Sequence, residues 1–463
     1  MPPLIAELPY CPPATGFMAH LIASPWAVWL DSGHPMSPQG RFDILSADPA
    51  ITLVTRGETT EWRSASGIYL SSDEPLRLLA EALGPRRSGI RGLPFIGGAI
   101  GYFSYDLGRQ LMGLPRRSPT ADALPEMAIG IYDWALILDH KRQRAALVGR
   151  DEARLRDWGA RWRAELGSAG VSSANHSPSR TPVAAEPPVP PAGIAPNLTR
   201  AAYLAAVGRI RDYLATGDCY QVNLAVRFSA PRKDDPWLSY QRLRALNPAP
   251  FAAYLQTPEV QILCSSPERF LRVGADGIVE TKPIKGTRPR ALDPREDAYL
   301  AESLRLSPKD RAENLMIVDL LRNDLGKVCA LGSVQVPGLF AIERFARVQH
   351  LVSTVTGRLA EGQTAIDLLR AAFPGGSITG APKRRAMEII DELEPHPRGV
   401  YCGAIGYLGF DGAMDTNIAI RTLVYTPDRI HLWAGGGIVF DSDPEAEYGE
   451  LLHKAAPLFD LLE

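Results

Sequence analysis

A glutamate and a lysine on either side of a predicted β-hairpin are the residues whose types and spacing best suit catalysis. Apolar residues alternate in 270–273 and 278–281 around a Gly-Ala-Asp-Gly turn, a pattern typical of two antiparallel strands. Glu268 precedes the first strand and Lys285 follows the second, so both side chains could share one end of the sheet. A carboxylic acid and an amine that face one pocket can act as general acid and nucleophile. The alternative is a surface ion pair beside a turn.

Two motifs around this hairpin and a third before it resemble one enzyme family. They are SPERF (266–270), PIKGT (283–287) and GDCYQVNL (217–224). In these segments the chain is similar to the chorismate-utilising enzymes, which include the large subunits of anthranilate synthase, isochorismate synthase and aminodeoxychorismate synthase. Anthranilate synthases usually have a small residue at the position of Lys285, whereas aminodeoxychorismate-forming members have a lysine. The resemblance therefore implies amination of chorismate to 4-amino-4-deoxychorismate, for p-aminobenzoate and folate synthesis.

The resemblance also implies roles for the polar residues near Lys285. Lys285 would add to C2 of the chorismate ring as the C4 hydroxyl leaves, Glu268 would protonate that hydroxyl, and ammonia would then displace the lysine. His350 would lie beside the ring, although a lone histidine in an alternating strand is more often structural. Gln221 would face the substrate where isochorismate-forming relatives carry a water-activating lysine. An amide cannot act as a base, so water addition is disfavoured and nitrogen chemistry is favoured.

Two glutamates are implied to bind Mg²⁺. Taken alone, 307–328 has the spacing of an amphipathic helix with solvated charges. The resemblance instead assigns Glu313 in this helix as one metal ligand, and Glu450 in the C-terminal helix as the other, with Glu447 one turn before it. Two carboxylates, several waters and a substrate carboxylate would suit Mg²⁺, which prefers octahedral oxygen ligation.

A second group of residues is implied to hold the substrate's other carboxylate. Arg421 is expected within an otherwise apolar strand that follows Tyr401, and an unpaired charge there would be costly. The resemblance supplies the enolpyruvyl carboxylate as its partner, together with Tyr401 and the backbone amides near Gly435 and Gly437. The alternative partner is a protein Asp or Glu. Thr379, in the segment GGSITGAP, is implied to contact the substrate as well.

A tryptophan pocket is implied away from these residues. In related anthranilate synthases the segment matching Leu30-Asp31-Ser32 binds tryptophan together with a proline-rich turn, which is NPAPF (247–251) here. Ser32 and Pro248 are therefore candidate tryptophan ligands. The alternative is that these residues form only a strand end and a turn.

The elements that must position these residues are mainly strands with helices around them. Short β-prone runs predict strands in 17–56, and 127–147 is expected to form two more. The resemblance implies an α+β fold with two large antiparallel β-sheets packed as a sandwich and flanked by helices. Helical spacing of apolar residues predicts helices over 75–84, 151–166, 199–216 and 307–328.

Composition divides the chain into three parts. The segment 167–197 is rich in Ser, Ala and Pro and cannot bury enough apolar area to fold, so it is expected to be a linker. It would separate an N-terminal portion, 1–166, from a chorismate-binding catalytic portion, 198–463.

The overall composition and the cysteine usage favour a cytoplasmic location. The 463 residues are 45% hydrophobic with a formal net charge of −2, which gives no reason to expect nucleic acid or an anionic membrane as a partner. No signal peptide and no membrane span are expected. The five cysteines are scattered without metal-type spacing, which fits a reducing compartment.

The resemblance implies a separate glutaminase subunit as the ammonia donor, because no cysteine-nucleophile motif followed by His-x-Glu is present. Two other functions stay open. Anthranilate synthase component I would release pyruvate, and Lys285 is the feature against it. A non-catalytic tryptophan-binding relative is disfavoured because Glu268, Lys285, Glu313 and Glu450 are all retained.

Overall fold

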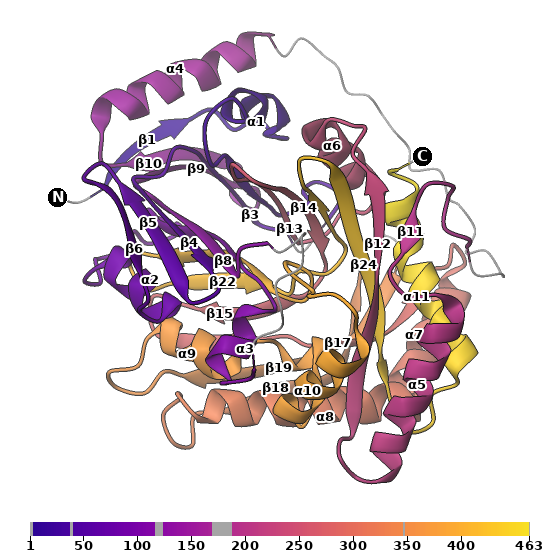
Figure 1. Ribbon diagram of the computed structural model, residues 1–463. Coiled ribbons are helices and arrows are strands. Elements are labelled where there is room, and N and C mark those ends of the chain that lie inside the picture. The colour runs from indigo at the N-terminus through magenta and orange to yellow at the C-terminus, as the bar shows by residue number, and fades with distance from the viewer. Residues whose placement is uncertain (1–2, 38–39, 116–123, 169–187, 346–347, 463) are drawn as a thin grey trace.

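Two twelve-stranded antiparallel sheets face one another in the computed structural model, with helices around them (Figure 1). The predicted α+β sandwich is therefore confirmed. The structure describes residues 3–37, 40–115, 124–168, 188–345 and 348–462.

The first sheet has the strand order β1-β10-β9-β3-β2-β13-β14-β23-β24-β12-β11, and β20 also pairs with β12. Its strands are β1 (Leu4–Leu8), β2 (Val28–Asp31), β3 (Phe42–Ser46), β9 (Trp134–Asp139), β10 (Arg144–Gly149), β11 (Ala195–Pro196), β12 (Gln221–Pro231), β13 (Phe251–Gln256), β14 (Gln261–Ser266), β20 (Gly380–Ala381), β23 (Thr422–Tyr425) and β24 (Arg429–Ile438).

The second sheet has the order β17-β19-β16-β15-β22-β21-β7-β8-β4-β5-β6, and β18 also pairs with β19. Its strands are β4 (Ile51–Arg56), β5 (Thr59–Ser64), β6 (Gly67–Ser71), β7 (Gly98–Phe103), β8 (Met127–Tyr132), β15 (Arg269–Val273), β16 (Ile278–Thr281), β17 (Ile284–Pro289), β18 (Gln335–Arg344), β19 (Val348–Arg358), β21 (Ala404–Gly409) and β22 (Met414–Asn417).

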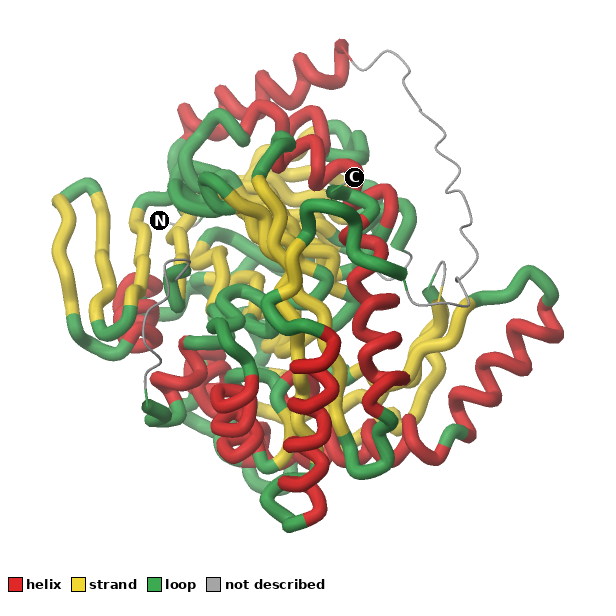
Figure 2. The backbone as a smooth tube through the Cα atoms, turned by 45° about the vertical axis from the view of Figure 1, so that its right-hand side comes forward, coloured by secondary structure: helices red, strands yellow, loops and turns green. Residues whose placement is uncertain are grey.

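Most helices lie on the outside of the molecule, many strands run through its middle, and a further group of strands forms the left-hand edge of the view (Figure 2). None of the helices in the described ranges is long and apolar enough to cross a membrane. The helices are α1 (Thr15–Leu21), α2 (Pro75–Leu83), α3 (Leu107–Leu111), α4 (Glu152–Ser168), α5 (Arg200–Ala215), α6 (Pro236–Leu246), α7 (Pro294–Leu306), α8 (Pro308–Gly326), α9 (Ala365–Ala372), α10 (Lys383–Leu393) and α11 (Pro444–Phe459), with a short 3₁₀ turn, η1 (Gly376–Ile378).

Both sheets take strands from both sides of the predicted linker. In the first sheet β2 pairs with β13, and in the second β7 pairs with β21, so N-terminal and C-terminal portions share each sheet. Helix α4 extends to Ser168, past the expected boundary at 166. Most of the predicted linker, residues 169–187, lies outside the described residues.

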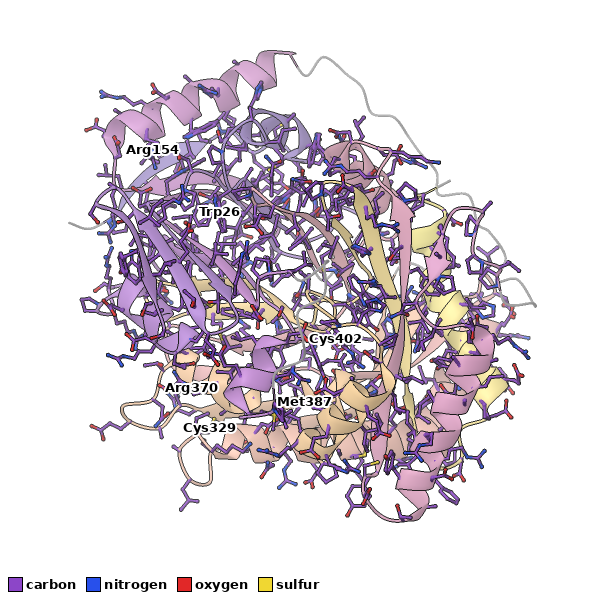
Figure 3. The ribbon with its side chains drawn as sticks, in the orientation of Figure 1. Trp26, Arg154, Cys329, Arg370, Met387 and Cys402 are labelled. Carbon is purple, nitrogen blue, oxygen red and sulfur yellow. The ribbon has the colours of Figure 1, made fainter. Side chains whose placement is uncertain are left out.

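Large side chains fill the interior between the sheets (Figure 3). Trp29 on β2 and Tyr102 on β7 are fully buried, one from each sheet. The hydroxyl of Tyr132 on β8 donates to the carbonyl of Trp26, just before β2, at 2.8 Å. This bond links the two sheets at a point where a buried phenol needs a partner.

Four local predictions need correction. The beginning of 17–56, expected to form a strand, belongs to helix α1, because Phe17, Met18 and Leu21 are buried along one helical face; in this segment strands begin only at β2.

The segment 127–147 holds parts of three strands rather than two, because Asp133 interrupts the first run and separates β8 from β9. Tyr401 lies in a turn, and β21 begins only at Ala404. Arg421 is not inside a strand: its φ of +53° places it in the left-handed region, directly before β23.

Candidate active site

The predicted hairpin forms and brings the candidate acid and nucleophile together. Strands β15 and β16 pair in antiparallel register, and β17 then carries Lys285 beside β19. The Nζ of Lys285 donates to Glu313 Oε1 at 2.7 Å and to the carbonyl of Ser377 at 3.2 Å. The Lys285 side chain is 11% exposed and Glu268 is buried, so these two residues are not the exposed ion pair that was the alternative expectation.

Glu268 lies next to this lysine in a buried position. Burial raises the pKa of the Glu268 carboxyl to about 7, and this rise is opposed by the charge of Lys285 and by hydrogen bonds from Ser377 and the Ile284 amide. A carboxyl group with this pKa can both give and take a proton near neutral pH, which is what acid–base catalysis requires.

Gln221, on β12, also contacts Glu313. Its Nε2 donates to Glu313 Oε1 at 3.0 Å, the oxygen that Lys285 also contacts. Its Oε1 is buried and has no hydrogen-bond partner among the described residues. Such an acceptor is costly unless a bound molecule satisfies it. Gly437, opposite Asn223 in the β12–β24 ladder, leaves room for this side chain: a Cβ there would lie 1.9 Å from Gln221 Nε2.

Glu313 and Glu450 reach the same region from two helices. Ser307 caps α8, which carries Glu313, and Asp443 caps α11, which carries Glu450. Each carboxylate contacts a lysine, Glu313 with Lys285 and Glu450 with Lys454 at 2.7 Å.

The electrostatics of these two carboxylates fit a cation. Burial favours the neutral form of Glu313, but Lys285 and Lys454 outweigh it and lower the pKa of that carboxyl, against a smaller opposing effect of Glu450. Lys454 lowers the pKa of Glu450. Two ionised carboxylates that repel one another, with oxygen-only donors, suit Mg²⁺. Among the described residues no group of three or more His, Cys, Asp or Glu side chains is placed to hold a metal, whereas the predicted set needs only two.

Glu447 is less suited to this role than its neighbour. It is 6% exposed and accepts a hydrogen bond from Ser442 Oγ at 2.7 Å. Burial raises the pKa of the Glu447 carboxyl. Its Oε1 is therefore already occupied by the protein, which favours Glu450 as the second candidate ligand.

His350 is buried on β19, opposite Thr287 in β17. Thr287 Oγ1 lies 2.9 Å from His350 Nδ1, and the Phe345 ring packs against the imidazole edge. Burial lowers the pKa of His350 to about 4, and the charge of Arg421 adds to this effect. The imidazole is therefore neutral at neutral pH.

Arg421 lies near His350, Tyr401 and α11. Its Nη1 donates to the carbonyl of Lys454 at 2.8 Å. No carboxylate of the described residues forms an ion pair with it, so the protein Asp or Glu that was the alternative partner is not found among them. Burial lowers the pKa of its guanidinium, which shows that the surroundings leave its charge poorly compensated. Tyr401 stacks on Trp433 of β24, with ring centroids 5.9 Å apart.

Thr379 and Gly435 are in contact mainly with backbone atoms. Thr379 is fully buried and its hydroxyl donates to the carbonyl of Gly375 at 3.0 Å. A Cβ at Gly435 would lie 2.4 Å from the carbonyl oxygen of Leu224, so close strand pairing excludes a side chain there. The Gly435 carbonyl accepts a hydrogen bond from Lys454 Nζ at 3.0 Å.

A cavity of about 270 Å³ lies between the sheets near the predicted tryptophan residues. Ser32 lines it, but the proline-rich turn contributes Pro250 and Phe251 rather than the predicted Pro248. The Ser32 hydroxyl donates to Asp43 Oδ1 at 2.7 Å. The volume is near the lower end of that of small-molecule pockets.

Two residues of the candidate active site were not singled out from the sequence. Ser377 contacts both Glu268 and Lys285, and Lys454 contacts Glu450. The spacing of Lys454 four residues after Glu450 on one helix was a signal for their contact. No comparable signal existed for Ser377, because its partners come from distant strands.

The fold and the comparison with known families identify a chorismate-binding enzyme. A family profile described as "chorismate binding enzyme" matches residues 33–460, which is most of the chain. The chain therefore belongs to this family.

The individual relatives include both aminodeoxychorismate synthase and anthranilate synthase components. The chain is 47% identical to the aminodeoxychorismate synthase component 1 of Salmonella typhimurium, covering 100% of this chain and 98% of that protein. It is 39% identical to the anthranilate synthase component 1 of Thermus thermophilus, over 97% and 95% of the two chains. The crystal structure of anthranilate synthase component I from Streptococcus pneumoniae aligns with a TM-score of 0.78 at 33% identity, over 91% and 92%.

Proposed function

We propose that this enzyme aminates chorismate to 4-amino-4-deoxychorismate, using ammonia from a separate glutaminase subunit. The observation that carries the proposal is Lys285, a shielded amine in contact with Glu313 and next to Glu268. Full-length similarity to aminodeoxychorismate synthase component 1 supports it, and the word component in that name supports a partner subunit. The product would serve p-aminobenzoate and folate synthesis.

In the proposed reaction Lys285 acts as nucleophile and Glu268 as general acid. Lys285 first releases its proton to solvent. The neutral amine then attacks C2 of the ring with its lone pair, the double bond shifts, and the C4 hydroxyl leaves as water with the proton of Glu268. Ammonia then attacks C4, the double bond shifts back, and the C2–N bond to Lys285 breaks. Glu268 takes the proton that the incoming nitrogen loses. A positioned acid of this kind contributes roughly 10²–10⁴-fold.

The remaining residues bind the substrate in this proposal. Arg421, which lacks a protein carboxylate partner among the described residues, pairs with the enolpyruvyl carboxylate. Neutral His350 orients the ring substituents, and the unpaired Oε1 of Gln221 accepts a hydrogen bond from ammonia. Glu313 and Glu450 would hold Mg²⁺, which as a Lewis acid polarises the ring carboxylate when bound.

Compartment and regulation are further parts of the proposal. All five cysteines are unpaired, and four of them are buried, which supports a reducing cytoplasm. Tryptophan is the proposed ligand of the cavity lined by Ser32. A tryptophan titration followed by fluorescence, with Ser32→Trp as a variant that fills the cavity, tests this part separately.

Anthranilate synthase is the second candidate, and it is supported by the similarity to anthranilate synthases in both sequence and structure. Mass spectrometry of the purified protein with chorismate, Mg²⁺ and ammonium separates the two. We expect aminodeoxychorismate from the wild type and a much smaller yield, or anthranilate, from Lys285→Ala. Anthranilate from the wild type would refute the amination proposal.

A further inference from the structure

A second hollow, of about 600 Å³, lies beside the loop that follows α2. It is lined by the loop residues 86–93 together with Ala275 and Asp411. Ala275 belongs to the turn of the β15–β16 hairpin, whereas Glu268 and Lys285 lie at the opposite end of that hairpin. This hollow is therefore separate from the candidate active site.

The side chains around the hollow carry an excess of positive charge. Arg86, Arg87 and Arg91 line it, and Asp411 is the acidic side chain among the described residues that do so. Asp411 is only 4% exposed, and its Oδ1 accepts a hydrogen bond from the Ala413 amide at 3.1 Å. Three guanidinium groups thus face one carboxylate that is largely withdrawn from the hollow.

The loop is held in place by the turn after β21. The Arg87 amide donates to the carbonyl of Phe410 at 2.8 Å, and Arg86 Nε donates to the carbonyl of Asp411 at 2.7 Å. A Cβ at Gly89 would lie 2.5 Å from Asp411 Oδ2, so a glycine is needed for this close approach. The arginines are therefore presented by a preformed loop, which lowers the entropy cost of binding a ligand.

The guanidinium groups lack counter-charges. The Cζ of Arg87 lies 4.0 Å from the centroid of the Phe410 ring, and that of Arg150 lies 5.4 Å from the same centroid. Burial and the charge of Arg150 lower the pKa of the Arg87 guanidinium. The Nε of Arg150 is buried and has no hydrogen-bond partner among the described residues. No carboxylate in the described ranges forms an ion pair with Arg87, Arg91 or Arg150.

We propose that the loop 86–91 binds the phosphate group of a small anionic ligand. A guanidinium group donates two parallel N–H bonds to phosphate oxygens, and two or more such groups can share one phosphate. The amides of residues 88–91 form no backbone hydrogen bond within the described part of the chain, so they are further donors, together with the Ser88 hydroxyl. A phosphate has more oxygens and more charge than a carboxylate, and it therefore matches this number of donors better.

The test is calorimetric titration of the full chain with inorganic phosphate at constant ionic strength. Arg91→Gln and Arg87→Gln should each weaken binding by about tenfold or more, because each removes charge-assisted hydrogen bonds. Arg91 is exposed, so its replacement should leave the fold intact even if loss of the Arg87–Phe410 contact does not. The matched control is Arg77→Gln, an exposed arginine of α2 that pairs with Asp73 at 3.5 Å, and it should bind phosphate like the wild type.

Two further probes define the ligand. Phenyl phosphate that binds more tightly than inorganic phosphate would identify a phosphorylated metabolite as the source of the phosphate, and equal binding would identify free phosphate; both results agree with the inference. Acetate should bind more weakly than either. No saturable phosphate binding by the wild type, wild-type affinity in Arg91→Gln, an equal loss in Arg77→Gln, or acetate binding as tight as phosphate would each overturn the inference. None of these readouts uses chorismate, so the outcome is independent of the proposed reaction.

Discussion

Lys285 Nζ lies 2.7 Å from Glu313 Oε1, so the candidate nucleophile and a candidate magnesium ligand share one ion pair. The same Glu313 oxygen accepts a hydrogen bond from Gln221 at 3.0 Å. Three side chains from β12, β17 and α8 thus meet at a single oxygen atom. A change of charge at this oxygen is therefore expected to affect the Lys285 amine, the candidate metal site and the Gln221 amide together.

Replacement of the nucleophile is the most direct prediction. Lys285→Ala should lower the rate of aminodeoxychorismate formation by about 10³-fold or more, because the proposed covalent step is lost. Product yields measured by mass spectrometry check this. Lys282→Ala, on the same hairpin and paired with Glu343, is a suitable control and should keep most of the activity. Full activity in Lys285→Ala would contradict the lysine mechanism.

Ionisation of Glu268, the candidate general acid, should make activity fall at high pH. Since burial raises the pKa of Glu268 to about 7, the fraction in the acid form falls above this pH, and kcat/KM should fall with it. Glu268→Gln should lower the rate by roughly 10²–10⁴-fold and remove this limb. Rates measured from pH 5 to 9 test both statements. A wild-type profile that stays flat through pH 7 would contradict the assignment.

The same group predicts a pH dependence of stability. The ordinary pKa of this carboxyl is 4.5 and the folded value is about 7, so between these values the folded protein keeps a proton that the unfolded chain has released. Stability should therefore fall as pH rises through this window, by about 3 kcal/mol from this group. Urea unfolding at several pH values should show a smaller fall in Glu268→Gln, which cannot ionise.

Metal affinity should depend on two glutamates from different helices. Glu313→Gln and Glu450→Gln should each weaken Mg²⁺ binding in calorimetric titrations by at least about tenfold, since each removes a charged oxygen ligand. Glu445→Gln is the matched control, because this exposed residue is on α11 but pairs with Arg200 instead. Equal affinity in all three variants would show that the metal binds elsewhere.

The buried pair under η1 should contribute strongly to stability. Arg398 and Glu394 are 1% and 3% exposed at their side chains. Arg398→Met leaves the Glu394 carboxylate buried without its partner and should cost about 3–5 kcal/mol in the free energy of unfolding. The double variant Arg398→Met/Glu394→Gln should recover part of this loss, as measured by urea unfolding. No recovery would mean that the loss comes from other contacts of Arg398.

Local patterns determined much of what was predicted correctly. The turn at 274–277 specified the hairpin, the helical spacing of apolar residues predicted the helices over 199–216 and 307–328, and alternation indicated the strands. These signals involve residues within a few positions of one another, so the sequence contains them directly. The motifs around Lys285, Gln221 and Glu313 identified the family, and the family profile confirmed it.

Only the tertiary structure decided which groups meet. Ser377 and Arg398 contact partners on β12 and β17 that lie far away in sequence, and no local pattern reveals such contacts. Arg421 was misplaced because its left-handed backbone is set by packing before β23 and not by its own propensity. The raised pKa of Glu268 comes mainly from burial. Burial depends on how distant elements pack together, which the sequence alone does not reveal. Sequence thus determines which chemical groups are present, whereas packing determines their distances and protonation.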